Sequence, residues 1–363
     1  MKAWTTQYRP RKFADLQLTD VREQMLELQK NASFPQVLLF AGPKGTGKTS
    51  TARILAATLN APANSKLVDE IYLQEDKADK KATGSLADPD WDDPAQRQIL
   101  QGNSYAVVEI DAASHRGIDD VRALQEQAYL PPSMSKMLVY ILDEVHMFTS
   151  EAFNALLKIL EEPPRHAIFI LATTEDYKIP ATVKSRCRVV NFRQATTAEI
   201  QEVCERIAKA EKLQVEPEAV AEIARLSEGS FRDGVKMLQT VAGGEKKVTL
   251  ERVHKLLVGG QQEQIEQLLQ IVMTKDSQQL VDFFDKLRQQ QTNESFWLKN
   301  LYHFLYEQLV ANINGQKVQL NDKQARFLLS TLLATGENYS PIAFLPVELQ
   351  FLEIFEQAKK QKK

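Results

Sequence analysis

Residues 42–49 read Gly42-Pro43-Lys44-Gly45-Thr46-Gly47-Lys48-Thr49 and follow a short apolar run, Gln36–Phe40. They fit the pattern G-x-x-x-x-G-K-[ST], in which the glycines let backbone N–H groups approach phosphates. The helical stretch Thr49–Leu59 comes next, and the amino end of a helix adds partial positive charge. This succession of strand, loop and helix predicts a phosphate site in a parallel sheet that is covered by helices.

Each residue type in this loop has a chemical use. We expect Lys48 to neutralise the β- and γ-phosphate oxygens and the Thr49 hydroxyl to ligate Mg²⁺, so the predicted cofactors are ATP and Mg²⁺. The alternative is a glycine-rich turn without a ligand, and the agreement of motif and context argues against it. The predicted nucleotide contacts of the loop are Gly42, Pro43, Lys44, Gly45, Thr46, Gly47, Lys48, Thr49 and Ser50.

A second apolar run, Val139–Leu142, ends in two carboxylates, Asp143 and Glu144. Parallel strands end at the same edge of a sheet, so Asp143 is expected beside the Mg²⁺ that Thr49 holds. Glu144 is then placed to orient or deprotonate the attacking water. An apolar strand followed by Asp-Glu is a weak signal alone, but together with the glycine-rich loop it is a strong one.

The rest of the first part alternates strand and helix patterns. We predict strands at Ala106–Asp111, Met137–Leu142 and Ala167–Thr173, which are aliphatic nearly throughout, as strands buried on both faces are. The segment Ala61–Ser104 is polar, proline-containing and acidic, and we expect it to be an insertion.

Helical periodicity replaces the strand pattern after Phe192, where we expect no further strands. The paired glycines at 259 and 260 indicate a linker. The expected domains are an α/β domain over 1–194, with 61–104 inserted, a helical domain over 195–259 and an all-α domain over 260–363.

Composition sets limits on the class of protein. The chain has 363 residues, 43% of them hydrophobic, with two cysteines and a net charge of -3. It shows no apolar run of the ~20 residues that span a bilayer and opens on no signal peptide pattern, so we expect a cytoplasmic protein without membrane contact. Two cysteines are too few for a disulfide framework. Without an overall basic charge, any contact with nucleic acid must come from a local surface or from partner subunits.

Several motifs carry a resemblance to a known family. They are Tyr8-Arg9-Pro10, Glu109–Ser114, Asp143–Met147, Phe153–Lys158, Leu160–Pro164, Ala172–Thr174, Ser185-Arg186-Cys187 and Gly229–Asp233. In these the chain resembles the gamma/tau clamp-loader subunits of bacterial DNA polymerase III, which are AAA+ ATPases. The motifs cover residues 8–60 and 105–240 densely, whereas the last hundred residues match only in helical character and in Phe344–Leu349.

The resemblance implies a fold and residue roles. The fold is an AAA+ P-loop parallel-sheet domain with a helical lid, followed by an all-α collar. Thr174 takes a sensor role near the γ-phosphate, Arg232 is the sensor of the lid in the same chain, and Arg186 is an arginine finger for a neighbour's nucleotide. Tyr8, Arg9 and Pro10 bind the nucleotide on its adenine side. The chain departs from the family at 16–19, Leu-Gln-Leu-Thr, which puts other adenine-side contacts in doubt.

The implied function is that of an ATP-driven subunit in a hetero-oligomeric ring with delta-type and delta-prime-type subunits. The ring opens a sliding clamp and loads it onto primed DNA. One alternative is an inert scaffold of the delta-prime kind, against which the intact Lys48, Thr49, Asp143 and Glu144 argue. Another is an AAA+ helicase or branch-migration motor, which leaves Ser185-Arg186-Cys187 and the Leu-Glu-Glu-Pro-Pro helix end unexplained.

Three further expectations concern single features. Arg116, in a loop before the predicted helix Ile118–Ala128, is a candidate DNA contact, and a capped helix start is an equally good interpretation. His146 is interpreted as structural. The insertion contains no cysteine or histidine where the family carries a four-cysteine zinc module, so we expect no structural zinc, with Leu67, Val68, Ile71, Leu73 and Trp91 packing instead and Glu75–Asp88 mobile.

Overall fold

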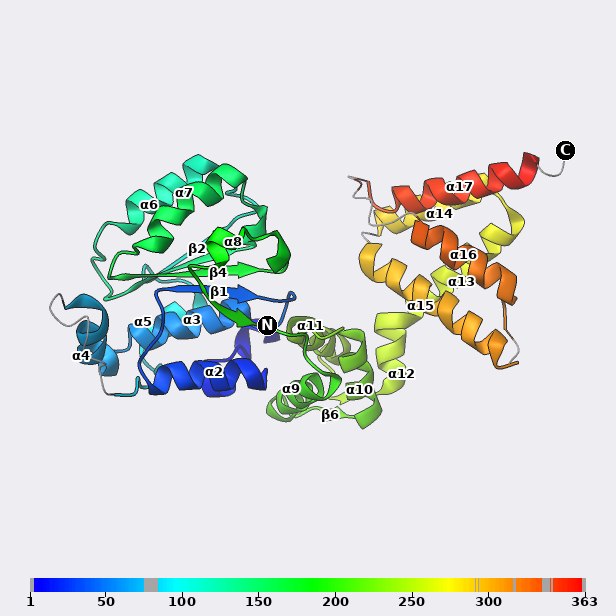
Figure 1. The fold of residues 1–363 in the computed structure, drawn as a ribbon. Helices are drawn as coiled ribbons and strands as arrows, with labels where there is room; N and C mark the ends of the chain where they lie inside the picture. Colours follow the sequence, from blue (N-terminus) through cyan, green and yellow to red (C-terminus); the bar gives the residue numbers. More distant parts are fainter. Residues whose placement is uncertain are drawn as a thin grey trace. The chain divides into compact units, whose positions relative to one another are not determined.

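The computed structural model describes residues 3–74, 84–290, 292, 294–315, 318–334, 340 and 342–360. The chain divides into two compact units, Met1–Val253 and His254–Lys363 (Figure 1). Of the helices in these described ranges, none combines the length and the apolar character that crossing a membrane requires.

The first unit is built on a five-stranded sheet whose strand order is β2-β3-β4-β1-β5. The strands are β1 (Val37–Ala41), β2 (Val107–Asp111), β3 (Leu138–Asp143), β4 (Ala167–Thr173) and β5 (Arg188–Asn191), and all neighbours are parallel. Four of them lie where the sequence predicted strands, within one residue at each end. Only Val190 of β5 is buried, so this edge strand lacks the apolar run that marks the others.

Helices cover both faces of the sheet. Figure 1 shows α6 (Ile118–Ala128) and α7 (Ser150–Glu161) on one face, with α2 (Thr19–Lys30) and α3 (Lys48–Leu59) on the other. The N-cap of α7 is Thr149, whose Oγ1 accepts the Ala152 N–H at 3.2 Å. The predicted parallel sheet covered by helices is therefore confirmed.

The register of the sheet places the functional residues. Ala41 at the end of β1 pairs with Thr173 of β4, and Asp111 at the end of β2 pairs with Asp143 of β3. Since β4 lies between β1 and β3, Thr173 stands between the glycine-rich loop and the Asp143 carboxylate at one sheet edge.

The insertion is ordered by packing and hydrogen bonds in the part that the structure describes. It forms η2 (Pro62–Asn64), α4 (Ser65–Val68), the π-helical turn η3 (Asp69–Leu73) and α5 (Pro94–Gln101). Val68 is buried as predicted, but its partner one turn on is Tyr72, whose hydroxyl donates to the Phe34 carbonyl at 2.7 Å. Leu67, Ile71 and Leu73 are only half-buried.

Trp91 does provide a second anchor, because the Arg11 guanidinium lies 3.8 Å from the centre of its ring. Of the predicted mobile segment, residues 75–83 lie outside the described residues. The expectation is wrong for its end, because Leu86 is buried and its N–H donates to the Gln29 carbonyl at 3.0 Å.

The sheet is followed by a small helical region, which we call the lid. It contains α9 (Thr197–Ala210), α10 (Pro217–Leu226), α11 (Phe231–Ala242) and α12 (Leu250–Val253). The expectation of no strand after Phe192 is wrong, since β6 (Gln214–Val215) and β7 (Lys247–Val248) form a two-stranded parallel sheet. Two-residue strands carry no periodic signal.

The second unit is helical throughout its regular elements. These are η6 (His254–Gly259), α13 (Gly260–Thr274), α14 (Ser277–Gln289), α15 (Glu294–Ile313), α16 (Asp322–Ala334) and α17 (Leu345–Lys360). Its core gathers around Trp297, Phe284 and Phe344, which are all fully buried. The paired glycines at 259 and 260 lie in helical structure that runs from η6 into α13, so the linker expected there is absent from this described stretch.

Candidate nucleotide site

The glycine-rich loop connects β1 to α3 at the carboxyl edge of the sheet. Gly45 and Gly47 have φ values of 80° and 106°, in the left-handed region that favours glycine. A Cβ on Gly45 would lie 2.0 Å from Ser230 Oγ, so only a glycine lets the helical lid approach the loop this closely. α3 begins at Lys48, and its amino end therefore faces the space enclosed by loop and lid.

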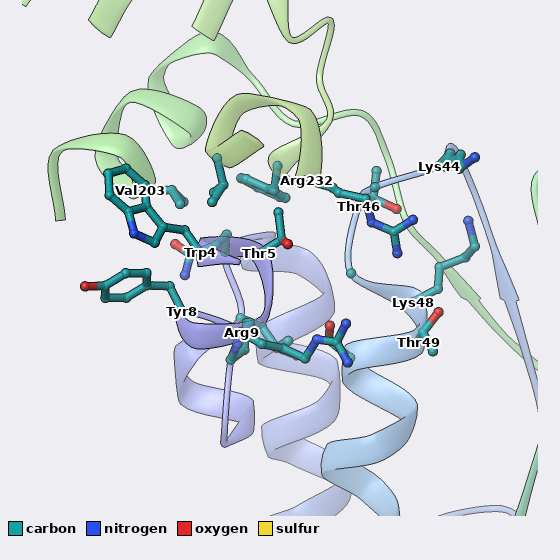
Figure 2. Close-up of a pocket in the computed structure, with 18 of the residues that line it drawn as sticks. Trp4, Thr5, Tyr8, Arg9, Lys44, Thr46, Lys48, Thr49, Val203 and Arg232 are labelled. Atoms are coloured by element: carbon teal, nitrogen blue, oxygen red, sulfur yellow. The ribbon is translucent and has the colours of Figure 1, made fainter. Parts of the chain in front are cut away.

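A cavity of about 360 Å³ lies beside this loop. Figure 2 shows Trp4 and Tyr8 at one end of it and Lys48 and Thr49 at the other. The predicted residues that line it are Tyr8, Arg9, Pro10, Lys44, Gly45, Thr46, Gly47, Lys48, Thr49, Ser50, Asp143, Glu144 and Arg232. The predicted contacts Gly42 and Pro43 do not line the cavity. Their carbonyl oxygens accept hydrogen bonds from the Lys48 ammonium at 2.6 and 2.9 Å.

Three cationic side chains converge on the cavity. In Figure 2, Arg9 extends toward the start of α3 and Arg232 extends from the lid toward Thr46 of the loop. Burial lowers the pKa of Lys48, and burial together with the nearby Arg53 and Arg232 lowers the pKa of Arg9. Of these cations Lys48 is buried and Arg9 is half-buried. Neighbouring cations with reduced solvation are stabilised by an anion, and a polyphosphate supplies the matching charge.

Carboxylates occupy the other wall. Asp143 ends β3, and its Oδ1 accepts the Glu144 N–H at 3.0 Å. Burial raises the pKa of Asp143, and the carboxylate charges of Glu144 and Asp111 act in the same direction, against the hydrogen bond from the Glu144 N–H. A divalent cation would offset the same unfavourable charge.

The donor set fits Mg²⁺ bound together with a nucleotide. Thr49 and Asp143 both line the cavity and offer hard oxygen ligands. Within the described residues, no cluster of three or more His, Cys, Asp or Glu side chains is suited to a metal. Mg²⁺ here would therefore complete its shell with phosphate oxygens and water, as it does in P-loop enzymes.

Glu144 has an unusual backbone and a fixed side chain. Its φ is 49°, in the left-handed region that few non-glycine residues adopt and that often marks functional sites. The Thr174 hydroxyl donates to Glu144 Oε2 at 2.9 Å, and the Thr174 N–H lies 3.3 Å from the same oxygen. The structure thus brings the predicted sensor threonine and the predicted water-activating carboxylate into contact.

Three further predicted residues do not line the cavity: Thr174, which contacts Glu144, and the arginines Arg186 and Arg116. Arg186 follows α8 (Ala181–Lys184), and its Nε donates to Glu161 Oε1 of α7 at 2.8 Å. Arg116 precedes α6, and the N–H of Gly117, the N-cap of α6, donates to Asp120 Oδ2 at 3.1 Å. This carboxylate supports the interpretation of a capped helix start and leaves the DNA contact to Arg116 alone.

At the end of the cavity near Trp4 and Tyr8, sequence reasoning predicted only Tyr8, Arg9 and Pro10 and missed the other lining residues. The additional lining residues are Trp4, Thr5, Leu16, Gln17, Val203, Arg206, Phe231 and Val235. Trp4 lies four residues before Tyr8, and Phe231 and Val235, on either side of Arg232, are four residues apart. Helical periodicity around residues already chosen was therefore the available signal. Leu16 and Gln17 come from the segment that departs from the family pattern.

The N-terminal segment is fastened to the lid at this end. Tyr8 OH donates to Glu211 Oε1 at 2.6 Å, and Trp4 N–H donates to Gln239 Oε1 at 2.9 Å. Burial, with help from Glu211, raises the pKa of Tyr8 to about 12. Tyr8 therefore presents its ring to the cavity and its hydroxyl to the lid.

Two family models match parts of this chain. Residues 18–196 match a family model described as DNA polymerase III, delta subunit, and residues 199–246 match one described as DNA polymerase III clamp loader subunit, ATPase lid domain.

Curated relatives include DNA polymerase III subunit tau of Bacillus subtilis, 41% identical over 64% of this chain and 38% of the relative. Subunit gamma/tau of Mycoplasma genitalium is 30% identical over 92% of this chain and 53% of the relative. Subunit tau of Escherichia coli is 35% identical over 69% and 36%, respectively. This chain thus spans between about a third and about half of the length of these relatives.

Among solved structures, the Thermotoga maritima RuvB Holliday junction branch migration motor is similar with a TM-score of 0.47 and 18% identity. The match covers 73% of this chain and 80% of RuvB.

Proposed function

Because this chain belongs to the gamma/tau family of bacterial DNA polymerase III clamp-loader subunits, we propose that it is an ATP-driven subunit of a clamp loader. It binds ATP with Mg²⁺, and hydrolysis of ATP by water accompanies release of the clamp on DNA. The observation that carries this proposal is one cavity lined by the glycine-rich loop, Asp143, Glu144 and Arg232.

The phosphate end of the cavity supports a division of labour. Lys48 neutralises the β- and γ-phosphates, and Thr49 and Asp143 hold Mg²⁺. Glu144 orients or deprotonates the attacking water, with Thr174 beside it. Arg232 reaches the phosphates from the lid of the same chain, so nucleotide binding and lid position depend on each other.

The base end supports recognition by stacking and packing. Tyr8, Arg9 and Pro10 would meet the adenine side of the nucleotide, as the family resemblance implies. Trp4 and Val203 add apolar surface from the N-terminal segment and from the lid. An aromatic ring and aliphatic side chains suit a flat base, while the cations lie nearer the phosphates.

Partners follow from the family and are part of the proposal. They are delta-type and delta-prime-type subunits in a hetero-oligomeric ring, a sliding clamp and primed DNA. This activity belongs in the cytoplasm, where bacterial DNA lies. Arg186 is proposed to reach the nucleotide of a neighbouring subunit, and Arg116 is proposed as a DNA contact.

The two alternatives make different demands on the site. An inert scaffold of the delta-prime kind needs no water-activating residue, yet Glu144 is present and held by Thr174. An AAA+ helicase or branch-migration motor shares the nucleotide site but acts on DNA without a clamp. ATPase assays with DNA, with clamp and with both separate the three, and stimulation that needs both supports the clamp loader.

The site assignment is tested with two substitutions. Lys48→Ala should abolish ATP binding, because Lys48 meets the phosphates in the ground state. Glu144→Gln should retain ATP binding and lose hydrolysis by about 10²–10⁴-fold, because it acts only in the chemical step. Nucleotide titration and steady-state turnover measure the two effects. Turnover of Glu144→Gln at the wild-type rate would show that another residue activates the water.

A further inference from the structure

His146 lies between two carboxylates beside the site. Its side chain is only 6% exposed, and it follows Glu144 in the 3-10 turn η4 (Val145–Met147). Nδ1 is 3.0 Å from Thr173 Oγ1 and 3.4 Å from Glu144 Oε2, while Nε2 is 3.2 Å from Glu175 Oε1. The ring therefore bridges the end of β3 and the end of β4.

The contacts of the Glu144 carboxylate fall on one of its two oxygens. Oε2 accepts hydrogen bonds from the Thr174 hydroxyl and the Thr174 N–H, and it lies 3.4 Å from His146 Nδ1. Among the described residues, no corresponding contact is made to Oε1. When one oxygen of a carboxylate is held by hydrogen bonds, the other oxygen has a fixed direction and can accept a proton from a substrate.

Glu175 is itself held in place on the far side of the ring. Lys178 Nζ lies 2.7 Å from Glu175 Oε2, and the Tyr177 hydroxyl donates to the same oxygen. The hydrogen bond from Lys178 is the main reason that the pKa of Glu175 falls below its usual range. His146 thus rests against an anion whose position is fixed by its own partners.

We propose that His146 is a positioning residue for the proposed water-activating carboxylate. Held by Thr173 and Glu175, its ring fixes Glu144 Oε2, so that Oε1 faces the attacking water. This inference rests on the proposed function and goes beyond it, because it gives a buried side chain outside the cavity lining a part in the chemical step. It predicts an effect on turnover and none on nucleotide affinity.

The shape of the imidazole provides matched variants. In His146→Asn the amide nitrogen takes the place of Nδ1, near Glu144, whereas in His146→Gln it takes the place of Nε2, near Glu175. We expect His146→Ala to lower kcat by about 10- to 100-fold, less than loss of the base itself, with unchanged ATP affinity. His146→Asn should recover most of the rate, and His146→Gln should resemble the alanine variant.

Glu175→Gln tests the far side of the ring. It should lower kcat by a smaller factor, and the double variant with His146→Ala should be no slower than His146→Ala alone, because both changes act through one ring. The measurements are kcat, KM, ATP titration and thermal unfolding of the full chain with ATP and Mg²⁺, repeated with clamp and primed DNA.

Besides a wild-type rate in His146→Ala, two results would overturn the positioning role. One is an equal rate loss in the Asn, Gln and Ala variants that follows their loss of thermal stability. The other is weaker ATP binding with unchanged kcat. The wild-type chain and Glu144→Gln separate this failure from failure of the proposed function: if the wild type does not hydrolyse ATP, both fall. If the wild type is active, Glu144→Gln is inactive and His146→Ala equals the wild type, only the role of His146 falls.

Discussion

At Gly42 the chain leaves β1 with a φ of 148°, and a Cβ built there would lie 1.8 Å from the Phe192 carbonyl oxygen. That atom is backbone at the end of β5, so it cannot rotate away as a side chain would. The Phe192 N–H in turn donates to the Ala41 carbonyl at 2.7 Å, which fixes the two segments against each other. Gly42 is therefore required by the close approach of two backbone segments as well as by its conformation.

We predict that Gly42→Ala lowers the free energy of unfolding by more than the ~1–3 kcal/mol expected from backbone strain alone. Gly244→Ala is the matched control, because its φ is 88° but nothing lies within 4 Å of the added Cβ. Urea denaturation of both variants measures the difference. Equal losses would mean that the Phe192 carbonyl moves aside without cost.

The cavity-lining residues around the glycine-rich loop could be chosen one by one from the sequence, whereas at the other end only Tyr8, Arg9 and Pro10 were chosen. Lys48 and Thr49 belong to a motif of fixed spacing, and Asp143 ends an apolar strand that accompanies it, so the sequence pattern identifies them. Trp4 and Val203 contact the cavity through apolar surface, for which many residue types serve and which only the fold brings together. His146 was interpreted as structural because no second histidine stands at ligand spacing, and its contacts with Glu144 and Glu175 form only when β3 and β4 pair.

Among the elements, α9 depends on a charged capping arrangement at its start. Thr196 Oγ1 accepts the Glu199 N–H at 3.2 Å, and the Glu199 carboxylate accepts the Thr196 N–H at 2.8 Å. Arg193 donates to Glu199 Oε1 and Oε2 at 2.6 and 2.8 Å and also reaches Asp20 of α2. The start of the lid is thus tied to the sheet domain through one arginine.

This arrangement predicts a pH dependence of stability. The hydrogen bond from Arg193 is the main cause that lowers the pKa of Glu199 from 4.5 to about 2. The folded-state pKa lies below the unfolded one, so the stabilisation is complete above pH 4.5 and is lost as the pH falls toward 2.

Glu199→Gln should therefore lower the free energy of unfolding by about 1–3 kcal/mol at pH 7, and the difference should shrink in acid. Glu202→Gln, an exposed position on the same helix, is the control. Denaturation at several pH values measures both, and a difference that does not change with pH would contradict the charged cap.

The insertion gives an element-scale prediction about metal. Residues 61–104 contain no cysteine and no histidine, and their described part is held by side-chain amides. Gln29 Nε2 donates to the Leu86 carbonyl at 3.0 Å, and Asn64 Nδ2 donates to the Ala87 carbonyl at 3.0 Å. We predict that protein purified without chelator contains no zinc by elemental analysis and that EDTA leaves its unfolding midpoint unchanged. A structural zinc site needs about four N or S ligands, so one zinc per chain would disprove this.

Elements were predictable where burial imposes a pattern. Strands β1, β3 and β4 are covered on both faces and read as continuous apolar runs. β5, with one buried residue, and the two-residue strands β6 and β7 have no such pattern, because pairing with a neighbour rather than burial defines them. Tertiary contacts alone decide such elements.

For the whole molecule, the sequence predicted more about the first unit than about the second. The first unit, Met1–Val253, contains the dense motifs, and their chemistry determined which edge of the sheet carries the site. The second unit, His254–Lys363, was predicted only as helical, since amphipathic periodicity gives helices without their arrangement. The domain bounds at 194, 195, 259 and 260 remain predictions.

The largest prediction concerns how several copies or subunits act together. Arg186 does not line the cavity of its own chain and is held by Glu161, 31% of its side chain being exposed. An exposed ion pair of this kind contributes little to stability, so Arg186 can exchange Glu161 for a phosphate at small cost. A guanidinium supplied by a neighbouring subunit stabilises the charge that develops on the transferred phosphoryl group. In GTPases this raises the rate of hydrolysis by ~10³–10⁵-fold.

We therefore expect Arg186→Ala to lower the rate of ATP hydrolysis strongly in the assembled ring, although by a smaller factor than in GTPases. The ATP affinity of the isolated chain should not change. Mixing gives the decisive measurement. Arg186→Ala chains retain an intact site but offer no finger, and Glu144→Gln chains offer a finger but have no active site of their own. Mixed rings should regain activity that is greatest near equal proportions, because only interfaces between unlike chains are complete. Failure to recover at every ratio would show that Arg186 does not act on its neighbour.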